Sequence, residues 1–364
     1  MDTQPLLIIG AGKIGPVIAC LLADTQEYKI HLADLHFKGT TIAYLQANRP
    51  EITLLTLDVS DTAALKDYVQ RHAITTLISA LPFNLSIPIV NQAKNLGLNY
   101  FDLTEDVAVS QVVKQLAQGA SSAFVPQCGL APGMVGIIAN DFTKHFDKVD
   151  TIKLRVGALP AYSSNSLGYA LNWSVDGLIN EYINSCLAIV DGQKTTLTAL
   201  EGLEQLEIDG CLYEAFNTSG GLGSLADIYE GKVNTLNYKT LRYPGHCAIM
   251  RLLLNDLKLN QDRDTLKRIL ENSLPRNYHD VVVLCVSVAG WCAGEYLETN
   301  KVKKLYPKLI AGHQWSAIQV STASGACAII DLVLQNKNHY HGLVLQEQFA
   351  LDDVLQNRFG GYYS

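Results

Sequence analysis

Leu6-Leu7-Ile8-Ile9-Gly10-Ala11-Gly12-Lys13-Ile14-Gly15 places an apolar run directly before three glycines in GxGxxG spacing. This order is typical of a strand, a tight turn and the start of a helix in a dinucleotide-binding domain. Gly10 permits the turn, Gly12 lets the backbone approach a pyrophosphate, and Gly15 lets the helix pack closely on the sheet. The phosphates would lie at the helix N-terminus. The stretch therefore predicts a Rossmann-type domain.

A carboxylate closes the next apolar run. Asp34 ends the stretch from residue 28 to residue 34, a plausible second strand, and lies nineteen positions after Gly15. A carboxylate at this point accepts hydrogen bonds from ribose hydroxyls and repels a 2′-phosphate. We therefore expect NAD rather than NADP, although His36 and Lys38 would soften that preference. The loop residues expected at the cofactor are Gly10, Gly12, Lys13, Ile14 and Gly15.

The composition is that of a folded globular protein. The chain has 364 residues, of which 48% are hydrophobic and 17% charged, with a formal net charge of -7. It carries no basic run, so we expect no nucleic acid as a partner, and its length suits two domains. The first strand begins almost at once, which leaves no room for a signal peptide, and we expect no membrane-spanning stretch.

The cysteines are scattered and form no CxxC pair. Neither a disulfide framework nor a zinc or other metal site is therefore expected. This usage fits the reducing cytoplasm. The eight residues are Cys20, Cys128, Cys186, Cys211, Cys247, Cys285, Cys292 and Cys327.

The first third of the chain alternates short apolar runs with helical patterns. Such alternation predicts a doubly wound α/β fold with a parallel sheet. The strand-like runs are Leu6 to Gly10, Tyr28 to Asp34, Ile52 to Leu57, Thr75 to Ser79, Asn99 to Leu103 and Ala123 to Gln127. The helix-like stretches are Ile14 to Leu22, Ala63 to Arg71, Ser86 to Leu96 and Val107 to Ala117.

The pattern changes after residue 133. Gly129, Pro132 and Gly133 break the alternation and indicate a hinge. Residues 134–319 are expected to form a second, mixed α/β domain that binds substrate. Residues 1–133 form the dinucleotide-binding domain, which residues from about 320 to 364 complete, because a helix-like stretch from 323 to 334 returns the chain there. The expected second-domain strands include 151–156 and 281–288, with polar loops at 162–168 and 218–223.

Two further loops follow predicted strands and should extend the cofactor site, because ligands bind at the carboxyl ends of such strands. Asp58 follows the third strand and either bonds the adenine amino group or caps the next helix near Ser60 and Asp61. Small residues follow the fourth strand and either allow close approach to the nicotinamide or form a plain proline turn. They are Ala80, Leu81 and Pro82.

The fifth predicted strand ends in a cluster of carboxylates. The stretch 102–106 contains Asp102, Glu105 and Asp106, which is more than a helix N-cap requires. At least one of them is therefore a candidate for proton transfer or for binding a substrate amine, although all three could also serve only the turn and cap.

A cationic and aromatic segment in the second domain is the candidate substrate site. Residues 240–246 combine Arg242, whose planar guanidinium matches a carboxylate, with His246, which titrates near neutral pH. The alternative is a surface turn with an ordinary salt bridge. Hydroxyl donors and aromatic surface for the same substrate are expected from Thr218, Ser219, Tyr169 and Trp173, although a core position also suits Trp173.

These motifs together resemble the saccharopine dehydrogenase and lysine 6-dehydrogenase family. The resemblance rests on the glycine fingerprint and on more specific stretches, which are 128–133 (CGLAPG), 157–160 (GALP), 167–169 with 173–174, and 240–246. It implies a Rossmann domain completed by the C-terminal part of the chain, a second α/β domain, and oxidation of a C–N bond of lysine or saccharopine with NAD or NADP. It also implies a small amino-acid substrate and a homodimer.

One departure from the family bears on the substrate. Several relatives carry an arginine shortly after the Trp-Ser pair, where this chain has Val175-Asp176-Gly177. The missing cation favours a smaller amine such as lysine over saccharopine with its additional carboxylates.

Oxidation at a carbon bonded to nitrogen needs a neutral amine, because a protonated nitrogen has no lone pair to expel the hydride. Free amines have a pKa near ~10.4, so a base must take a proton first. The candidates are Asp102 or Glu105, with His246 next. Water would then hydrolyse the imine, giving an aldehyde and ammonia from lysine, or the aldehyde of lysine and glutamate from saccharopine.

Two other functions stay open from the residues alone. A carboxynorspermidine-type synthase would use related imine chemistry in the reductive direction. A redox sensor would bind NAD(P) without catalysis, since a Rossmann fold does not by itself imply an enzyme. The arginine, tyrosine and histidine cluster favours an enzyme, because a sensor has no need for it.

Overall fold

The computed structural model describes residues 3–276 and 279–363, which divide into two compact units. Unit 1 consists of Met1–Gly133, Leu309–Trp315 and Gln319–Ser364, and unit 2 consists of Met134–Lys308 and Ser316–Ile318. Each unit is built around its own main sheet.

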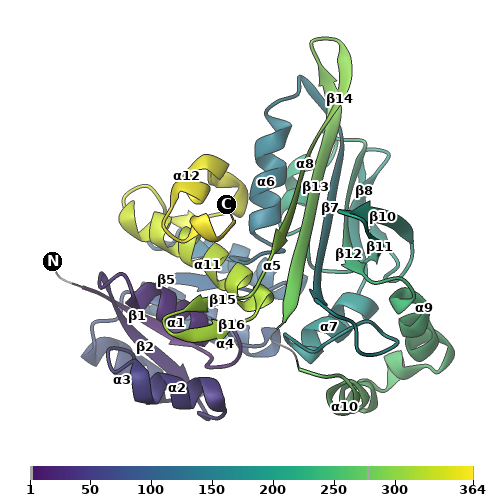
Figure 1. The fold of residues 1–364 in the computed structure, drawn as a ribbon. Coiled ribbons are helices and arrows are strands. Elements are labelled where there is room, and N and C mark those ends of the chain that lie inside the picture. The colour runs from purple at the N-terminus through teal and green to yellow at the C-terminus, as the bar shows by residue number, and fades with distance from the viewer. Residues whose placement is uncertain (1–2, 277–278, 364) are drawn as a thin grey trace. The chain divides into compact units, whose positions relative to one another are not determined.

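Unit 1 contains a seven-stranded sheet in the order β17-β6-β5-β4-β1-β2-β3, with all strands parallel (Figure 1). The order reverses at β1, between β4 and β2, which is the switch point where doubly wound sheets bind ligands. This confirms the predicted α/β class, and the C-terminal strand β17 was not predicted. The bounds are β1 (Gln4–Ile9), β2 (Tyr28–Asp34), β3 (Thr53–Thr56), β4 (Thr76–Ser79), β5 (Asn99–Asp102), β6 (Ala123–Val125) and β17 (Gly342–Leu343).

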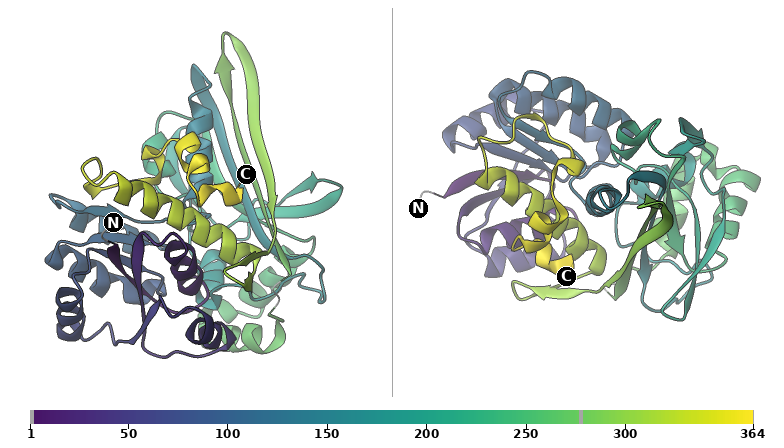
Figure 2. Two further views of the ribbon diagram at one scale, coloured as in Figure 1. Left: turned by 60° about the vertical axis from the view of Figure 1, so that its left-hand side comes forward. Right: turned by 90° about the horizontal axis from the view of Figure 1, so that it is seen from above.

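Helices cover both faces of this sheet (Figure 2). α1 is buried along its whole length, whereas the flanking helices bury one stripe against the sheet. The bounds are α1 (Gly15–Ala23), α2 (Thr40–Asn48), α3 (Thr62–Arg71), α4 (Ser86–Leu96), α5 (Val107–Ala117), α11 (Ala317–Gln335) and α12 (Leu351–Gln356).

The C-terminal segment is fastened to unit 1 by a buried carboxylate. Asp331, on α11, accepts hydrogen bonds from the hydroxyl of Tyr28 at 2.6 Å, from Asn357 Nδ2 at 2.7 Å and from Arg358 Nη2 at 2.6 Å. Arg358 also pairs with Glu27 at 2.6 Å. Because Tyr28 and Glu27 lie at the start of β2, this network ties the last residues to the N-terminal half of the sheet.

α11 differs from its prediction in two respects. It begins at Ala317 rather than at 323, because the carboxylate of Asp280, at the start of β13, accepts the N–H groups of Ala317 (2.6 Å) and Ile318 (3.1 Å) and caps it. Its length and mean hydropathy of 1.6 also meet the criteria for a membrane span, contrary to the expectation that no stretch would. However, 83% of that apolar window is buried, as in the core helix of a globular protein.

Unit 2 contains a mixed sheet with the main order β10-β11-β12-β7-β13-β14, in which β12 and β7 are parallel and β8 and β9 branch from β12. β13 and β14 form a long hairpin (Figure 1). The bounds are β7 (Lys148–Pro160), β8 (Cys186–Val190), β9 (Gln193–Leu197), β10 (Glu204–Ile208), β11 (Cys211–Asn217), β12 (Thr235–Arg242), β13 (Asp280–Cys292) and β14 (Glu295–Leu305). β15 (Lys308–Ile310) and β16 (His313–Trp315) form a separate two-stranded sheet.

Three helices of unit 2 share an apolar cluster. α7, α9 and α10 contribute buried side chains to it together with the loop before α7. This cluster positions the side chains of the candidate substrate site. The helices of unit 2 are α6 (Met134–Thr143), α7 (Val175–Ile183), α8 (Leu225–Tyr229), α9 (His246–Arg251) and α10 (Arg263–Ser273).

Candidate functional site

The glycine loop of unit 1 is shaped by close backbone contacts. A Cβ atom on Gly15 would lie 1.9 Å from the carbonyl oxygen of Gly10, and one on Gly10 would lie 2.6 Å from that of Ala80. Gly10 also has a φ of +107°, which disfavours any side chain. By contrast, nothing lies within 4 Å of a Cβ built on Gly12. The fold requires Gly10 and Gly15, whereas Gly12 leaves open space next to the backbone, which suits a pyrophosphate.

The start of α1 has no hydrogen bond from the side chain of its N-cap residue, Ile14, so its first-turn N–H groups are not satisfied by a capping side chain. Pro16, in the first turn, has no N–H to lose. The main-chain carbonyl of Lys13 accepts a hydrogen bond from Gln319 at 2.8 Å, which fixes the loop to α11. The loop therefore has the geometry of a phosphate cradle.

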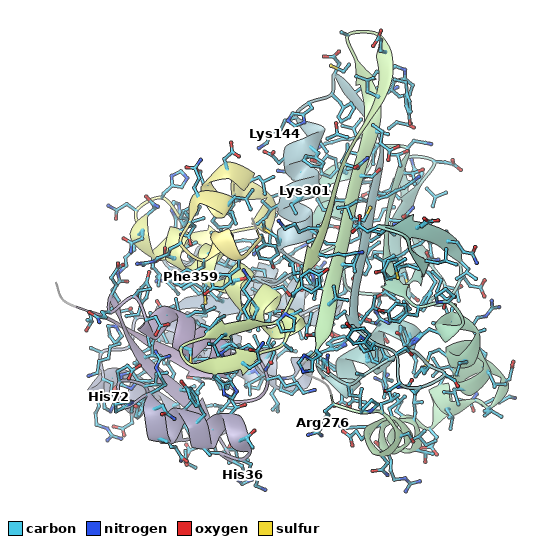
Figure 3. The ribbon with its side chains drawn as sticks, in the orientation of Figure 1. His36, His72, Lys144, Arg276, Lys301 and Phe359 are labelled. Carbon is cyan, nitrogen blue, oxygen red and sulfur yellow. The ribbon has the colours of Figure 1, made fainter. Side chains whose placement is uncertain are left out.

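Asp34 lies at the end of β2, next to the glycine loop. One carboxylate oxygen accepts the N–H of Ala11 at 2.6 Å and the other accepts the N–H of His36 at 3.0 Å. Each oxygen retains a lone pair for a ribose hydroxyl. His36 and Lys38 are exposed, and His36 lies at the surface of unit 1 (Figure 3).

Asp58 and the residues after β4 have different roles. Asp58 accepts hydrogen bonds from the N–H (2.9 Å) and hydroxyl (2.6 Å) of Ser60, and Asp61 is the residue that caps α3. Asp58 is thus exposed and stabilises a turn, and it is not the N-cap that was weighed as the alternative. Ala80 packs its backbone against Gly10, and Leu81 and Pro82 follow it after the carboxyl end of β4.

The carboxylates after β5 are divided between the turn and the helix. Asp102 is 1% exposed and its Oδ1 atom accepts the N–H groups of Thr104 (3.0 Å) and Gln127 (2.9 Å). Burial raises the pKa of Asp102 to about 6, against these hydrogen bonds, which lower it. Asp106 caps α5 by accepting the N–H of Val109 at 2.9 Å. Glu105 lies partly buried between them.

Arg242 is the centre of a buried polar cluster in unit 2. It ends β12 and is 3% exposed. Its Nε atom donates to the Tyr182 hydroxyl at 2.9 Å, and Nη1 donates to the hydroxyl of Thr240 at 3.0 Å and to the carbonyl of Leu241 at 2.9 Å. The guanidinium carbon lies 4.9 Å from the ring centroid of Tyr169. Because Nε and Nη1 are engaged, a bidentate grip on a carboxylate is blocked and Nη2 is the nitrogen that can bind one.

The hydrogen bonds of His246 fix its tautomer. Nδ1 lies 2.8 Å from the carbonyl oxygen of Leu167, which can only accept, so Nδ1 carries the proton. Nε2 then accepts from the Tyr182 hydroxyl at 2.9 Å, whose oxygen accepts from Arg242. Burial, and next the charge of Arg242, lower the pKa of His246 to about 3. His246 is therefore neutral with both nitrogens engaged, and the expectation that it acts as a base does not fit this geometry.

The other residues expected at the substrate hold the cluster together. Trp173 donates from Nε1 to the Tyr169 hydroxyl at 2.7 Å, and Tyr169 is fully buried. Ser219 donates its hydroxyl to Asn180 and its N–H to Glu181, both to main-chain carbonyls at 3.1 Å. Ser219 therefore fixes α7 and does not offer these donors to an anion. Among the described residues, the buried hydroxyl of Thr218 has no hydrogen-bond partner.

Two functional candidates were missed, and both lie on α7. Tyr182 links Arg242 to His246, and Glu181 faces Arg242, with 3.6 Å between Glu181 Oε2 and Arg242 Nη2. Glu181 is 14% exposed. The sequence signal was a carboxylate flanked by the apolar positions Ile179 and Tyr182, which are both buried on α7. Charged residues are rarely buried in a helix unless they are paired.

Two domain families match the chain. The family described as saccharopine dehydrogenase NADP binding domain matches residues 6–125, and the one described as saccharopine dehydrogenase C-terminal domain matches residues 129–360. Among curated proteins, the NADP(+), L-glutamate-forming saccharopine dehydrogenase of Pyricularia oryzae is 25% identical over 97% of this chain and 82% of its own length. The enzyme of that name from Saccharomyces cerevisiae is 22% identical over 98% and 81%.

Solved structures share the fold. Apo saccharopine dehydrogenase (L-Glu forming) from Saccharomyces cerevisiae has a TM-score of 0.76 at 18% identity and covers 98% of both chains. Homospermidine synthase from Legionella pneumophila, solved in complex with NAD, has a TM-score of 0.69 at 11% identity and covers 100% of this chain and 90% of its own. At these identities the likeness concerns the architecture.

Proposed function

The chain belongs to the saccharopine dehydrogenase family, and we propose that it oxidises the secondary C–N bond of saccharopine with NAD(P), releasing glutamate and the aldehyde of lysine. The chain is an NAD(P)-dependent oxidoreductase for a CH–NH donor. The observation that carries the choice of substrate class is Arg242, a buried cation held by three hydrogen bonds, whose Nη2 atom has no hydrogen bond to a described residue and lies 3.6 Å from Glu181 Oε2. The glycine loop supplies the matching cofactor cradle.

In the proposed reaction, different residues bind the cofactor, bind the substrate and transfer the proton. NAD(P), when bound, supplies the hydride acceptor, and Gly12, the start of α1 and Asp34 hold its pyrophosphate and ribose. Arg242 binds a substrate carboxylate. A base takes the proton of the substrate ammonium, so that the nitrogen lone pair can form the C=N bond as the hydride leaves carbon. Water then adds to the imine carbon and the old C–N bond breaks, which releases the amine and the aldehyde.

Asp102 is the proposed base. Its pKa of about 6 keeps it ionised at neutral pH and close enough to neutrality to exchange a proton. Glu105 is the second candidate, because it follows in the same loop and is partly buried. Asp102→Asn should lower kcat at least about a hundredfold with little change in cofactor affinity, and Glu105→Gln should do so only if Glu105 is the base.

The cofactor preference is a separate proposal. We infer that NAD is preferred, because the Asp34 carboxylate next to the glycine loop would repel a 2′-phosphate. The curated relatives are named for NADP, so a preference for NAD would distinguish this chain from them. The ratio of kcat/KM for NAD to that for NADP should exceed one and fall in Asp34→Ser. A ratio below one in the wild type would overturn the preference.

The assay that tests the function follows NAD(P)H absorbance on mixing the protein with NAD or NADP and saccharopine. Saccharopine is tested first because the curated relatives are named for it. Lysine, which the absence of an arginine after Ser174 favours, is the second substrate. Reaction only in the reductive direction, with an aldehyde, a polyamine precursor and NADPH, would favour a polyamine synthase. Bound cofactor without turnover of any amine would favour a sensor.

We further propose a homodimer that pairs β14 with β14 of a second copy. β14 is the last strand of its sheet and bears exposed Tyr296, Leu297 and Val302. Glu295 and Glu298 lie in its first half, and three lysines, including Lys301 on the ribbon in Figure 3, lie in its second half. Antiparallel self-pairing would bring opposite charges together.

The dimer is tested by the molar mass in solution. Glu298→Lys should weaken association, and the double charge swap Glu298→Lys with Lys304→Glu should restore it, because residues 298 and 304 lie on the same face of β14 and again oppose unlike charges. A monomeric wild type at micromolar concentration would overturn the proposal. The free cysteines of the described residues support a reducing, cytoplasmic location, which fractionation of the source cells would test.

A further inference from the structure

The ion pair of Glu181 and Arg242 leaves hydrogen-bonding capacity unused on both side chains. Three of the five N–H donors of Arg242 are used by protein acceptors, and Nη2 has no hydrogen bond to any described residue. Its nearest anionic atom is Glu181 Oε2 at 3.6 Å, which is within ion-pair range but beyond a hydrogen bond. A buried guanidinium nitrogen in this state is a ready anion-binding group.

The Glu181 carboxylate likewise lacks hydrogen-bond donors from the described residues at one of its oxygens. Its Oε2 atom accepts no hydrogen bond from the residues that the structure describes, although a carboxylate has room for about four. Burying Oε2 of an ionised carboxylate with one long ion pair is costly, whereas the side chain as a whole keeps 14% of its surface exposed and can be reached through its other oxygen. The groups around it supply little relief, since Tyr169, Tyr182 and Cys186 are neutral, and Arg242 is the charged group that acts on it. An additional cation would offset this cost.

We propose that Glu181 and Arg242 together bind the head group of an α-amino acid, the carboxylate at Arg242 Nη2 and the α-ammonium at Glu181. The two functions of such a head group are bonded to the same carbon, and the Glu181 carboxylate, whose Oε2 lies 3.6 Å from Arg242 Nη2, is partly exposed and can accept the ammonium through its other oxygen. A carboxylic acid without an amino group would bind Arg242 but would leave Glu181 without a cationic partner. Glu181 is then a specificity-determining residue, and the inference rests on the proposed function for the identity of the amino acid.

Binding of paired probes to the purified full-length protein tests this without turnover. L-glutamate and glutarate differ in the α-ammonium group, and so do L-lysine and 6-aminohexanoate. Dissociation constants are measured by calorimetry, or by competition with saccharopine, at about pH 8, where Glu181 is ionised. At least one amino acid should bind about tenfold or more tightly than its partner, as expected for a charge-assisted hydrogen bond.

Glu181→Gln should reduce that ratio to within about twofold. Glu181→Asp keeps the charge and should retain part of the preference, which covers the case in which the glutamine variant fails to fold. The matched control is Glu201→Gln, because Glu201 pairs with Arg251 at 3.2 Å on the exposed surface of the same unit. This control should leave the ratio unchanged.

A ratio that persists in Glu181→Gln would overturn the inference, and so would a wild type that binds neither amino acid or does not discriminate. Failure of the proposed function appears separately, as absence of NAD(P)H formation from saccharopine. Discrimination between the paired probes without turnover would leave the head-group site in place and reject the reaction.

Discussion

The glycine loop of unit 1 and the Arg242 cluster of unit 2 are built in opposite ways. The loop is a backbone site, since Gly10, Gly15 and Ala80 shape it through main-chain contacts. The cluster is a side-chain site, in which Arg242 from β12 meets Tyr182 from α7 and His246 from α9. A backbone site depends on which residues are small, and a side-chain site depends on which distant elements meet.

This difference decides what a substitution does. In the loop, adding one carbon atom blocks a backbone contact, so the effect depends on space. In the cluster, removing one group leaves its partners unsatisfied, so the effect depends on hydrogen bonds and charge. The following tests separate these two kinds of dependence.

The largest effect is expected from Gly15→Ala. Its Cβ atom would lie 1.9 Å from the carbonyl oxygen of Gly10, so the loop cannot keep its shape and cofactor binding should be lost. Gly12→Ala is the matched variant, because nothing lies within 4 Å of its Cβ. It should fold normally and weaken cofactor binding by about tenfold. Titration with NADH and NADPH measures both, and equal behaviour of the two variants would contradict a backbone-shaped site.

Arg242→Ala should come next, with kcat/KM for saccharopine reduced by a factor of about a hundred to a thousand through KM. The cofactor dissociation constant should stay within about twofold. The comparison variant is Arg251→Ala, which removes an exposed arginine of the same unit. Equal losses of substrate and cofactor affinity in Arg242→Ala would reject its assigned role.

Tyr182→Phe should cost stability more than activity. Removing the hydroxyl leaves Arg242 Nε without an acceptor and His246 Nε2 without a donor, which we expect to lower the free energy of unfolding by about 2 to 3 kcal/mol. Chemical denaturation measures this change. Tyr243→Phe breaks a single hydrogen bond, to the carbonyl of Pro160 at 2.9 Å, and should cost about 1 kcal/mol.

The smallest effect is a pH dependence of stability. The pKa of His246 is lowered from 6.5 to about 3, so between these values the unfolded chain binds more protons than the folded one. The contribution of His246 to stability should therefore fall as the pH decreases from about 6.5 toward 3, against the opposite contributions of Asp102 and Glu181, whose pKa values are raised to about 6 and about 7. His31 in unit 1, with a pKa of about 4, contributes in the same direction as His246. His246→Asn should flatten the slope, and an unchanged slope would contradict a neutral buried imidazole.

The two regions also differ in how far the sequence predicted them. The strands β1, β2, β4 and β5 and the roles of Gly10 and Gly15 follow from local pattern, because each depends on residues close in the chain. The start of α11 could not be predicted in this way, because its capping carboxylate, Asp280, belongs to a strand 37 positions earlier. The two-residue strand β17 is too short to leave a periodic signal.

In unit 2 the sequence predicted that Arg242 and His246 act at the substrate, and the hydrogen bonds of His246 do not fit the base role predicted for it. The pairing of His246 with Tyr182 spans 64 positions, and it is this contact that makes the imidazole an acceptor in a buried chain of hydrogen bonds. Glu181 escaped notice for the same reason, because its partner lies on another element. Residue types in the sequence predicted which segment carries the polar side chains. The hydrogen-bond partners of each side chain depend on tertiary contacts that the sequence pattern does not show.

The anchor at Asp331 has a consequence for synthesis on the ribosome. Tyr28 and Glu27 are translated early, whereas their partners Asp331 and Arg358 follow 303 and 331 residues later. Nearly all of unit 2 is one continuous stretch that can fold while translation proceeds, whereas the sheet of unit 1 lacks its edge strand β17 until residues 342–343 have been translated. This sheet therefore receives its last strand and its Asp331 anchor only after the whole of β7 to β14 has been made.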